Sequence, residues 1–121
     1  MSKPIIAMVD DQPFVCDMVK KILGNAYDVH TFTSGKDFLK YVNANVVDMF
    51  LLDYDMPEMT GYEVLMAVRS NRHNGKKPAV FLTAETNDRM KSEMLERGAN
   101  DYLCKPINSG ALLQCVKQYL K

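Results

Sequence analysis

The chain has 121 residues, and 15 lysines and arginines balance 15 aspartates and glutamates, so its formal net charge at pH 7 is zero. One domain is expected at this length, and the charge balance excludes the basic surface that nucleic-acid binding requires. The first residues are not a signal peptide, and no apolar run approaches the roughly 20 residues of a membrane span. We expect one cytoplasmic domain over residues 1–121, without direct nucleic-acid binding or membrane insertion.

Five short apolar runs alternate with five amphipathic segments. The runs predicted as strands are 5–9, 28–32, 46–52, 79–82 and 102–104. The predicted helices begin at Gln12-Pro13, near Ser34, after Thr60-Gly61, near Asn87-Asp88 and near Asn108. Repeated strand-helix units indicate an α/β fold with a parallel sheet covered by helices on both faces. In a doubly wound sheet, the first and fifth helices would share one face.

The first and fourth helices differ in their apolar stripes. The first stripe is broad and consists of Phe14, Val15, Met18, Val19, Ile22 and Leu23. The fourth helix has only Met90, Met94 and Leu95, which predicts a loosely held helix. Met90 and Met94 lie one turn apart and fit either core packing or a patch that binds a partner.

The three cysteines indicate neither disulfides nor a structural metal. Cys16, Cys104 and Cys115 are an odd number, without a CxxC pair and without histidines at zinc-ligand spacing. We expect all three to be reduced residues that pack in the interior.

Acidic residues and one lysine follow the ends of three predicted strands. Asp10 and Asp11 follow the first strand, Asp53 and Asp55 the third, and Lys105 the fifth. Ligands of open α/β sheets bind beyond the carboxyl ends of the strands, where these groups would meet. Crowded carboxylates repel one another, and a hard divalent cation such as Mg²⁺ would offset that repulsion. Carboxylates, a hard cation and an ammonium together predict a site that handles phosphoryl groups.

Taken alone, the acidic pair has a second interpretation. Asp10 and Asp11 precede Gln12-Pro13, so they fit equally well as capping residues of the first helix. Asp53 and Lys105 at neighbouring strand ends favour the site.

Five short motifs in this order resemble the receiver domain of two-component response regulators over essentially the whole chain. They are Val9-Asp10-Asp11, Leu52-Asp53, Met56-Pro57 with Gly61, Leu82-Thr83-Ala84, and the segment from Gly98 to Lys105-Pro106. The resemblance implies a flavodoxin-like (βα)5 three-layer sandwich with a parallel five-stranded sheet of order 2-1-3-4-5; a chemotaxis receiver is a standard example of that order. It also implies that the Lys105-Pro106 peptide bond is cis.

The resemblance assigns roles at the site. Asp53 would accept a phosphoryl group from a phosphohistidine or a small phosphodonor, forming an aspartyl phosphate. Mg²⁺, with Mn²⁺ as an alternative, would be held by Asp11 directly, by Asp10 through water, by Asp53, and by the backbone carbonyl of Asp55. Lys105 and Thr83 would contact phosphoryl oxygens. Asp55 is a departure, because an acidic side chain is less usual there and bears on metal affinity and phosphoryl lifetime.

The resemblance also implies a switch and its partners. Thr83 would move toward the phosphoryl group, Tyr102 would fill the space it leaves, and the surface of the fourth helix, fifth strand and fifth helix would change. The expected partners are a histidine kinase or histidine phosphotransfer protein, and a downstream target or a C-terminal output domain. The protein would be a monomer or a weak phosphorylation-linked dimer, with self-dephosphorylation rather than turnover of an external substrate.

Two other functions fit parts of the pattern. Asp53-Tyr54-Asp55 is a DxD sequence, as in aspartyl-nucleophile phosphatases of the haloacid dehalogenase type, although that family has its acidic pair last. A phosphorylation-independent interaction module would keep the fold without the chemistry. The glycine-rich motifs of nucleotide-binding folds are absent from the sequence.

Overall fold

The parallel sheet predicted from the sequence is present in the computed structural model, which describes residues 2–85 and 87–120. The strands are β1 (Ile5–Val9), β2 (Asp28–Phe32), β3 (Met49–Asp53), β4 (Ala79–Thr83) and β5 (Asp101–Cys104). They pair in parallel in the order β2-β1-β3-β4-β5, which confirms the predicted flavodoxin-like order. Their carboxyl ends therefore meet at one rim of the sheet.

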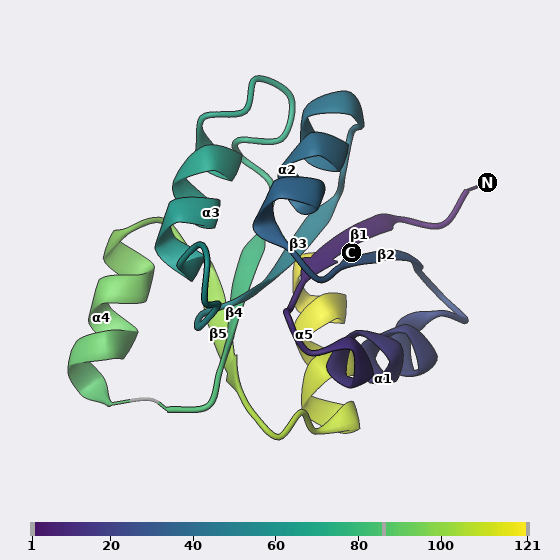
Figure 1. Ribbon diagram of the computed structural model, residues 1–121. Helices are drawn as coiled ribbons and strands as arrows, with labels where there is room; N and C mark the ends of the chain where they lie inside the picture. The colour runs from purple at the N-terminus through teal and green to yellow at the C-terminus, as the bar shows by residue number, and fades with distance from the viewer. Residues whose placement is uncertain (1, 86, 121) are drawn as a thin grey trace.

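Five helices cover the two faces of this sheet (Figure 1). They are α1 (Pro13–Leu23), α2 (Gly35–Ala44), α3 (Gly61–Arg69), α4 (Asp88–Glu96) and α5 (Ser109–Tyr119). One core joins α1 and α5 to one face of the sheet, and a second core joins α2, α3 and α4 to the other. The predicted division of helices between the faces is confirmed, as is the three-layer sandwich.

Local signals explain several of the element boundaries. Pro13 begins α1, where its missing N–H is no loss. Thr60 and Glu63 form a reciprocal capping box at α3, whereas at α2 the Ser34 hydroxyl accepts the Asp37 N–H. The third strand begins later than predicted, at Met49. Asp48 faces the Ile5 peptide, because its carboxylate accepts the Ile5 N–H at 2.7 Å and its own N–H donates to the Ile5 carbonyl at 2.8 Å.

The residues that the sequence assigned to packing differ in how far they are buried. Phe14 is 67% exposed, so its predicted place in the apolar stripe of α1 is wrong; the stripe is narrower than the periodicity suggested. Cys16 and Cys115 are buried as predicted, but Cys104 is exposed at the end of the edge strand β5. Met94 is fully buried in the second core and Met90 packs against the same core. Core packing, rather than a partner-binding patch, accounts for both methionines.

Gly61 begins α3 where the helix meets the end of β3. A Cβ atom at this position would lie 2.8 Å from the Phe81 ring, 2.9 Å from the Asp53 carbonyl oxygen and 2.9 Å from the Tyr54 Cα. Two of these atoms belong to the backbone and cannot move aside cheaply. The absence of a side chain at Gly61 therefore fixes how closely α3 approaches the chain around Asp53.

Gly61→Ala should consequently destabilise the protein by about 1–3 kcal/mol, the usual cost of overpacking a tight contact. Urea denaturation of wild type and variant measures this difference. Gly110→Ala is the matched control, because a Cβ at Gly110 would meet only the Asn108 side chain, at 3.3 Å. If the two substitutions were equally tolerated, the close approach of α3 would not be a constraint.

Candidate functional site

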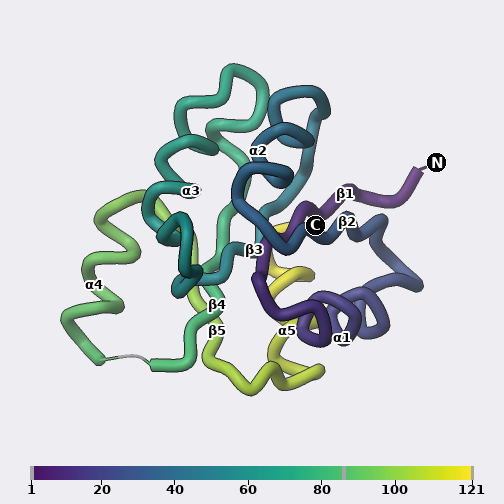
Figure 2. Tube along the Cα trace, viewed as in Figure 1, coloured from purple at the N-terminus to yellow at the C-terminus, as the bar shows by residue number. Residues whose placement is uncertain are grey.

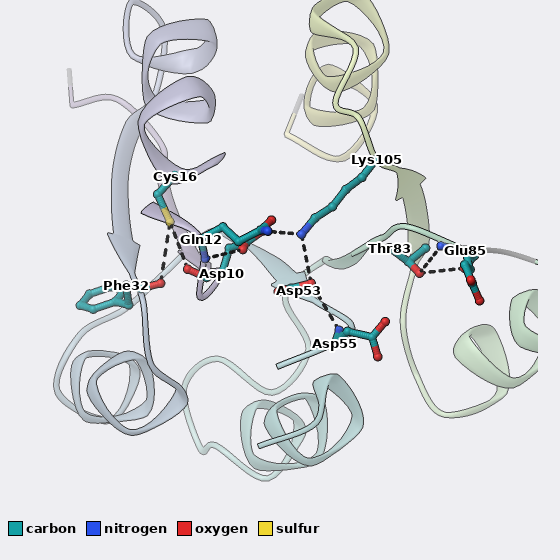
Figure 3. A network of polar contacts seen from close by, with 9 residues as sticks. All are labelled: Asp10, Gln12, Cys16, Phe32, Asp53, Asp55, Thr83, Glu85 and Lys105. Atoms are coloured by element: carbon teal, nitrogen blue, oxygen red, sulfur yellow. Dashed lines mark hydrogen bonds and ion pairs between the residues drawn. The ribbon is translucent and has the colours of Figure 1, made fainter. Parts of the chain in front are cut away.

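Two buried aspartates and one lysine meet at the carboxyl rim of the sheet (Figure 3). Asp10 follows β1, Asp53 ends β3, and Lys105 follows β5. The Lys105 Nζ lies 2.8 Å from Asp10 Oδ2 and 3.3 Å from Asp53 Oδ1. Asp10 is 0% exposed and Asp53 is 2% exposed, so Lys105 supplies the positive charge that two desolvated carboxylates need.

Further hydrogen bonds orient these carboxylates. Asp10 Oδ1 accepts the Gln12 N–H at 2.9 Å, and Asp53 Oδ1 accepts the Asp55 N–H at 3.3 Å. Among the described residues, the buried Asp53 Oδ2 has no hydrogen-bond partner. Such an atom is costly unless a ligand completes it, which makes Asp53 Oδ2 the open position of the site.

Burial sets the protonation of the site. Desolvation, reinforced by the charge of Asp10, raises the pKa of Asp53 to about 7 against the opposing influence of Lys105. Burial alone would lower the pKa of Lys105, but the hydrogen bond and charge of Asp10 and the charge of Asp53 raise it instead. Lys105 therefore stays an ammonium while Asp53 is a carboxylate that holds its charge with difficulty.

Asp11 completes a group of oxygen ligands. Carboxylate oxygens of Asp10, Asp11 and Asp53 all lie within 4.8 Å of one another, and Asp11 is exposed where the other two are buried. Hard oxygen donors in this number suit a hard divalent cation such as Mg²⁺. With Asp53 Oδ2 unpartnered, the residues fit the metal that the sequence predicts.

A hollow of about 210 Å³ gives access to the open position. It is lined by Asp11, Gln12, Asp53, Asp55, Ala84 and Lys105. A larger hollow of about 420 Å³ lies at the opposite, amino ends of β1 and β2, beside Lys3 and Tyr27. Size does not identify the site here; the hollow beside Asp53 is smaller, but the charged groups converge there.

Thr83 ends β4 and is buried at the same rim. Its hydroxyl donates to the Glu85 carbonyl at 2.8 Å and accepts the Glu85 N–H at 3.3 Å. Figure 3 shows the two residues turned toward each other and away from Asp53. In this arrangement the Thr83 hydroxyl is engaged by its own loop, so contact with a group on Asp53 requires it to rotate.

Tyr102, the proposed switch aromatic, lies on β5 and packs half-buried against the second core. The Nζ of Lys91, from α4, lies 5.5 Å from the centre of its ring. Tyr102 therefore joins the edge strand to α4, although its part in a switch stays a prediction.

The structure brings most of the predicted site residues together and adds one hydrogen-bond donor that the sequence analysis did not assign. Asp10, Asp11, Asp53 and Lys105 converge as expected, Asp55 lines the same hollow, and Lys105-Pro106 is cis as the resemblance implied. Sequence reasoning did not assign the Gln12 N–H, which orients Asp10. An Asp two residues before a potential donor is the pattern of an Asx turn, which was the available signal.

A parallel sheet of order 2-1-3-4-5 with acidic groups and a lysine at its carboxyl rim is the arrangement that the resemblance to receiver domains implies. A model of the response regulator receiver domain matches residues 6–117. The chain belongs to this family, which functions in two-component signalling. Membership leaves the haloacid dehalogenase interpretation without support.

Relatives and solved structures agree with this assignment. The chemotaxis protein CheY4 of Vibrio cholerae is 32% identical with a TM-score of 0.93, over 98% of this chain and 100% of that one. A probable cyclic di-GMP phosphodiesterase of Vibrio cholerae is 34% identical over 100% of this chain and 27% of its own length. The transcriptional regulatory protein PcoR of Escherichia coli is 31% identical over 97% of this chain and 51% of its own length.

The chain spans between 7% and 51% of the first five curated relatives that it matches. The domain boundaries of the whole protein therefore stay a prediction. Within the described part of the chain, every helix is too short or too polar to cross a bilayer.

Asp53→Asn should stabilise the protein in the absence of metal. The native pKa of Asp53 is raised to about 7, so the native state favours the protonated carboxyl. This form contributes its full stabilisation below the unfolded pKa near 4, and the contribution is lost as the pH rises through 7. Urea denaturation in EDTA should show wild type falling below Asp53→Asn over this interval, by up to about 4 kcal/mol at pH 8.

Asp17→Asn is the control for this experiment, because it removes an exposed carboxylate of α1 and should change stability by less than about 0.5 kcal/mol. A lower metal-free unfolding midpoint for Asp53→Asn than for wild type at pH 8 would contradict the prediction.

Proposed function

We propose that the protein is a phosphorylation-activated switch in which Asp53 accepts a phosphoryl group from a phosphohistidine on a partner protein. The observation that carries this proposal is the buried Asp53 carboxylate, whose unpartnered Oδ2 lies at a hollow shared with Asp11 and Lys105. The two-component family of the chain supports a histidine kinase or histidine phosphotransfer protein as the donor.

The side chains at the rim divide the work of the transfer. An Asp53 oxygen forms the new bond to phosphorus while the bond from phosphorus to the donor nitrogen breaks, and that nitrogen leaves with the electron pair of the broken bond. Lys105, already 3.3 Å from Asp53, pairs with a phosphoryl oxygen. Asp10 keeps the ammonium of Lys105 in place, 2.8 Å away. Burial of these groups strengthens each contact, because little water competes for it.

Asp10, Asp11, Asp53 and the backbone carbonyl of Asp55 would hold Mg²⁺ or Mn²⁺. A bound divalent ion neutralises charge on the transferring phosphoryl group. The positive charge of such an ion would also offset the effects of burial and of the Asp10 charge, which raise the pKa of Asp53. The Asp55 side chain lines the hollow and adds negative charge where the phosphoryl group would lie.

The signal leaves the site through Thr83. A phosphoryl group on Asp53 adds charge and strong hydrogen-bond acceptors at the rim, and these compete with the Glu85 carbonyl for the Thr83 hydroxyl. Movement of Thr83 opens space toward Tyr102, and the surface of α4, β5 and α5 responds. A downstream target, or an output domain in a longer protein, reads this surface.

Phosphorylation is tested with phosphoramidate, a small donor that needs no partner protein. In the presence of Mg²⁺, intact-protein mass spectrometry should show one added phosphoryl group on wild type and none on Asp53→Asn. Asp37→Asn, which removes an exposed carboxylate from α2, should behave as wild type. EDTA should abolish the modification. A folded wild type that gains no phosphoryl mass would instead support the interaction module.

Metal binding is tested separately by thermal unfolding. Mg²⁺ should raise the melting temperature of wild type, because an ion that binds only the native state stabilises it. Asp11→Asn should weaken the apparent Mg²⁺ affinity at least about tenfold, since losses of 10–100-fold follow even from outer-shell changes. Asp17→Asn should leave the Mg²⁺ titration unchanged, and an equal effect of both substitutions would exclude Asp11 as a ligand.

A further inference from the structure

The segment from the end of α3 to the start of β4 carries a local excess of positive charge. No aspartate or glutamate occurs between Glu63 and Glu85. All ion pairs within residues 2–85 and 87–120 involve side chains outside this segment, so no neighbouring carboxylate neutralises its basic side chains. These are Arg69, Arg72, His73, Lys76 and Lys77.

A hollow of about 370 Å³ opens on this segment. The segment leads into Ala79, the first residue of β4, so the hollow lies at the amino edge of the sheet, opposite Asp53. Its volume falls within the range of about 300–1,000 Å³ that is usual for small-ligand sites. Apart from one glycine, every residue of its lining is polar or charged. The lining consists of Arg69, Asn71, Arg72, His73, Gly75 and Lys76.

Arg69, the half-buried last residue of α3, gives the hollow a fixed positive charge. Its guanidinium donates to the carbonyls of Gly75 at 3.1 Å, Lys77 at 2.6 Å and Gly98 at 3.1 and 2.8 Å. It also donates to Asn100 Oδ1 at 3.0 Å. These acceptors are all neutral, so they orient the guanidinium without cancelling its charge. Burial lowers the pKa of Arg69, as expected for a cation removed from water without a carboxylate partner.

Asn74 anchors the segment to the rest of the domain. It is 0% exposed, and its side-chain nitrogen donates to the carbonyls of Val42 at 3.0 Å and Asn45 at 2.9 Å. Its side-chain oxygen accepts the Val47 N–H at 2.9 Å. Figures 1 and 2 show the segment beside the C-terminal end of α2. The loop that carries the basic side chains is therefore held from inside the protein.

Asn71 and Gly75 fix the turn within this loop. Asn71 Oδ1 accepts the N–H groups of His73 at 3.0 Å and Asn74 at 2.9 Å, and the Asn71 carbonyl accepts the Gly75 N–H at 3.0 Å. A Cβ atom at Gly75 would lie 2.7 Å from the carbonyl oxygens of Arg69 and Asn71, so the turn is tightly closed. A backbone fixed in this way needs no ordering when a ligand binds, which lowers the entropic cost of binding.

Basic residues after α3 also have a role that needs no ligand. Cations near the C-terminal end of a helix stabilise it by about 0.3–1 kcal/mol each, and this effect falls off within the last turn. It accounts for Arg69 at the end of α3. It does not account for Lys76, which lies seven residues after Arg69 and lines the same hollow as Arg72.

We propose that this hollow binds a short polyphosphate, either free or as the diphosphate group of a nucleotide. The exposed guanidinium of Arg72 has a fork of donors that matches phosphate oxygens, and Lys76 adds a second cation. Several cations around one hollow favour an anion with more than one charge. Arg69 is a positioning residue, because its donors are engaged and only its charge acts on the ligand. The site is separate from the phosphoryl site at Asp53 and does not depend on the proposed function.

Binding is tested by NMR titration of the isotopically labelled protein with sodium pyrophosphate, in EDTA to remove divalent ions. Wild type should show saturable shifts of the amides of residues 72–77, whereas the amides of Asp11 and Lys105 should not move. Arg72→Gln and Lys76→Gln should each weaken the apparent affinity about two- to fivefold, the equivalent of one exposed ion pair. Both side chains are exposed, so neither substitution disturbs the core.

Arg89→Gln and Lys36→Gln are the matched controls, because they remove the same charges from exposed positions of α4 and α2. Each should change the affinity for pyrophosphate by less than about 1.5-fold, since charges beyond a screening length contribute little. Equal weakening by Arg72→Gln and Arg89→Gln, or shifts that grow without saturation, would overturn the site. Asp53→Asn should bind pyrophosphate as wild type does, and a loss of binding in that variant would place the anion at the carboxyl rim instead.

ADP and AMP separate the sources of the ligand in the same titration. Equal affinities for ADP and pyrophosphate would support a free polyphosphate, and an affinity for ADP at least about tenfold higher would support a nucleotide. Equal binding of AMP and ADP would contradict the need for more than one phosphate. Saturable binding of poly-glutamate without binding of pyrophosphate would overturn the proposal in favour of an acidic protein segment.

Discussion

The burial of two carboxylates beside one ammonium governs the rest of this structure. Asp10 and Asp53 are almost completely inaccessible, and Lys105 lies between them. Desolvating two like charges is costly, and a single lysine offsets only part of that cost. The part of this desolvation cost that Lys105 does not offset is reflected in the raised pKa of Asp53. The site is therefore destabilising by itself and favours any ligand that adds positive charge.

The fold tolerates these crowded buried charges because the sheet beneath them is apolar on both faces and stabilises the domain. All five residues of β3 and all five of β4 are buried, and each face has its own hydrophobic core. Parallel pairing aligns β1, β3 and β4 so that their carboxyl ends fall at one rim. Hydrophobic burial in the sheet offsets the free-energy cost of the buried charges at the rim. A stable scaffold commonly carries a destabilising functional site in this way.

The two ends of the molecule differ in how firmly they are held. At the amino edge, Arg69 satisfies several carbonyls at once, and Asn74 is fully buried with bonds to Val42, Asn45 and Val47. At the carboxyl rim, Thr83 is held through its own loop and α4 begins with an exposed turn. The amino edge is therefore held by more side-chain hydrogen bonds than the carboxyl rim near Thr83, and segments with fewer such contacts open more readily.

The sequence by itself determined the alternation of strands and helices, the convergence of Asp10, Asp11, Asp53 and Lys105, and, through family resemblance, the strand order. These follow from local periodicity and from the position of a residue at the end of a strand, which neighbouring residues specify. Periodicity misplaced Phe14, and the number and spacing of the cysteines misplaced Cys104, since exposure depends on what the rest of the chain packs against each position. Only the tertiary structure decided the unpartnered Asp53 Oδ2, the bond that turns Thr83 toward Glu85 and away from Asp53, and the contacts of Arg69 and Arg97 at the end of α4. Most of these contacts join residues far apart in the chain, and all depend on distances of a few ångströms that no sequence pattern encodes.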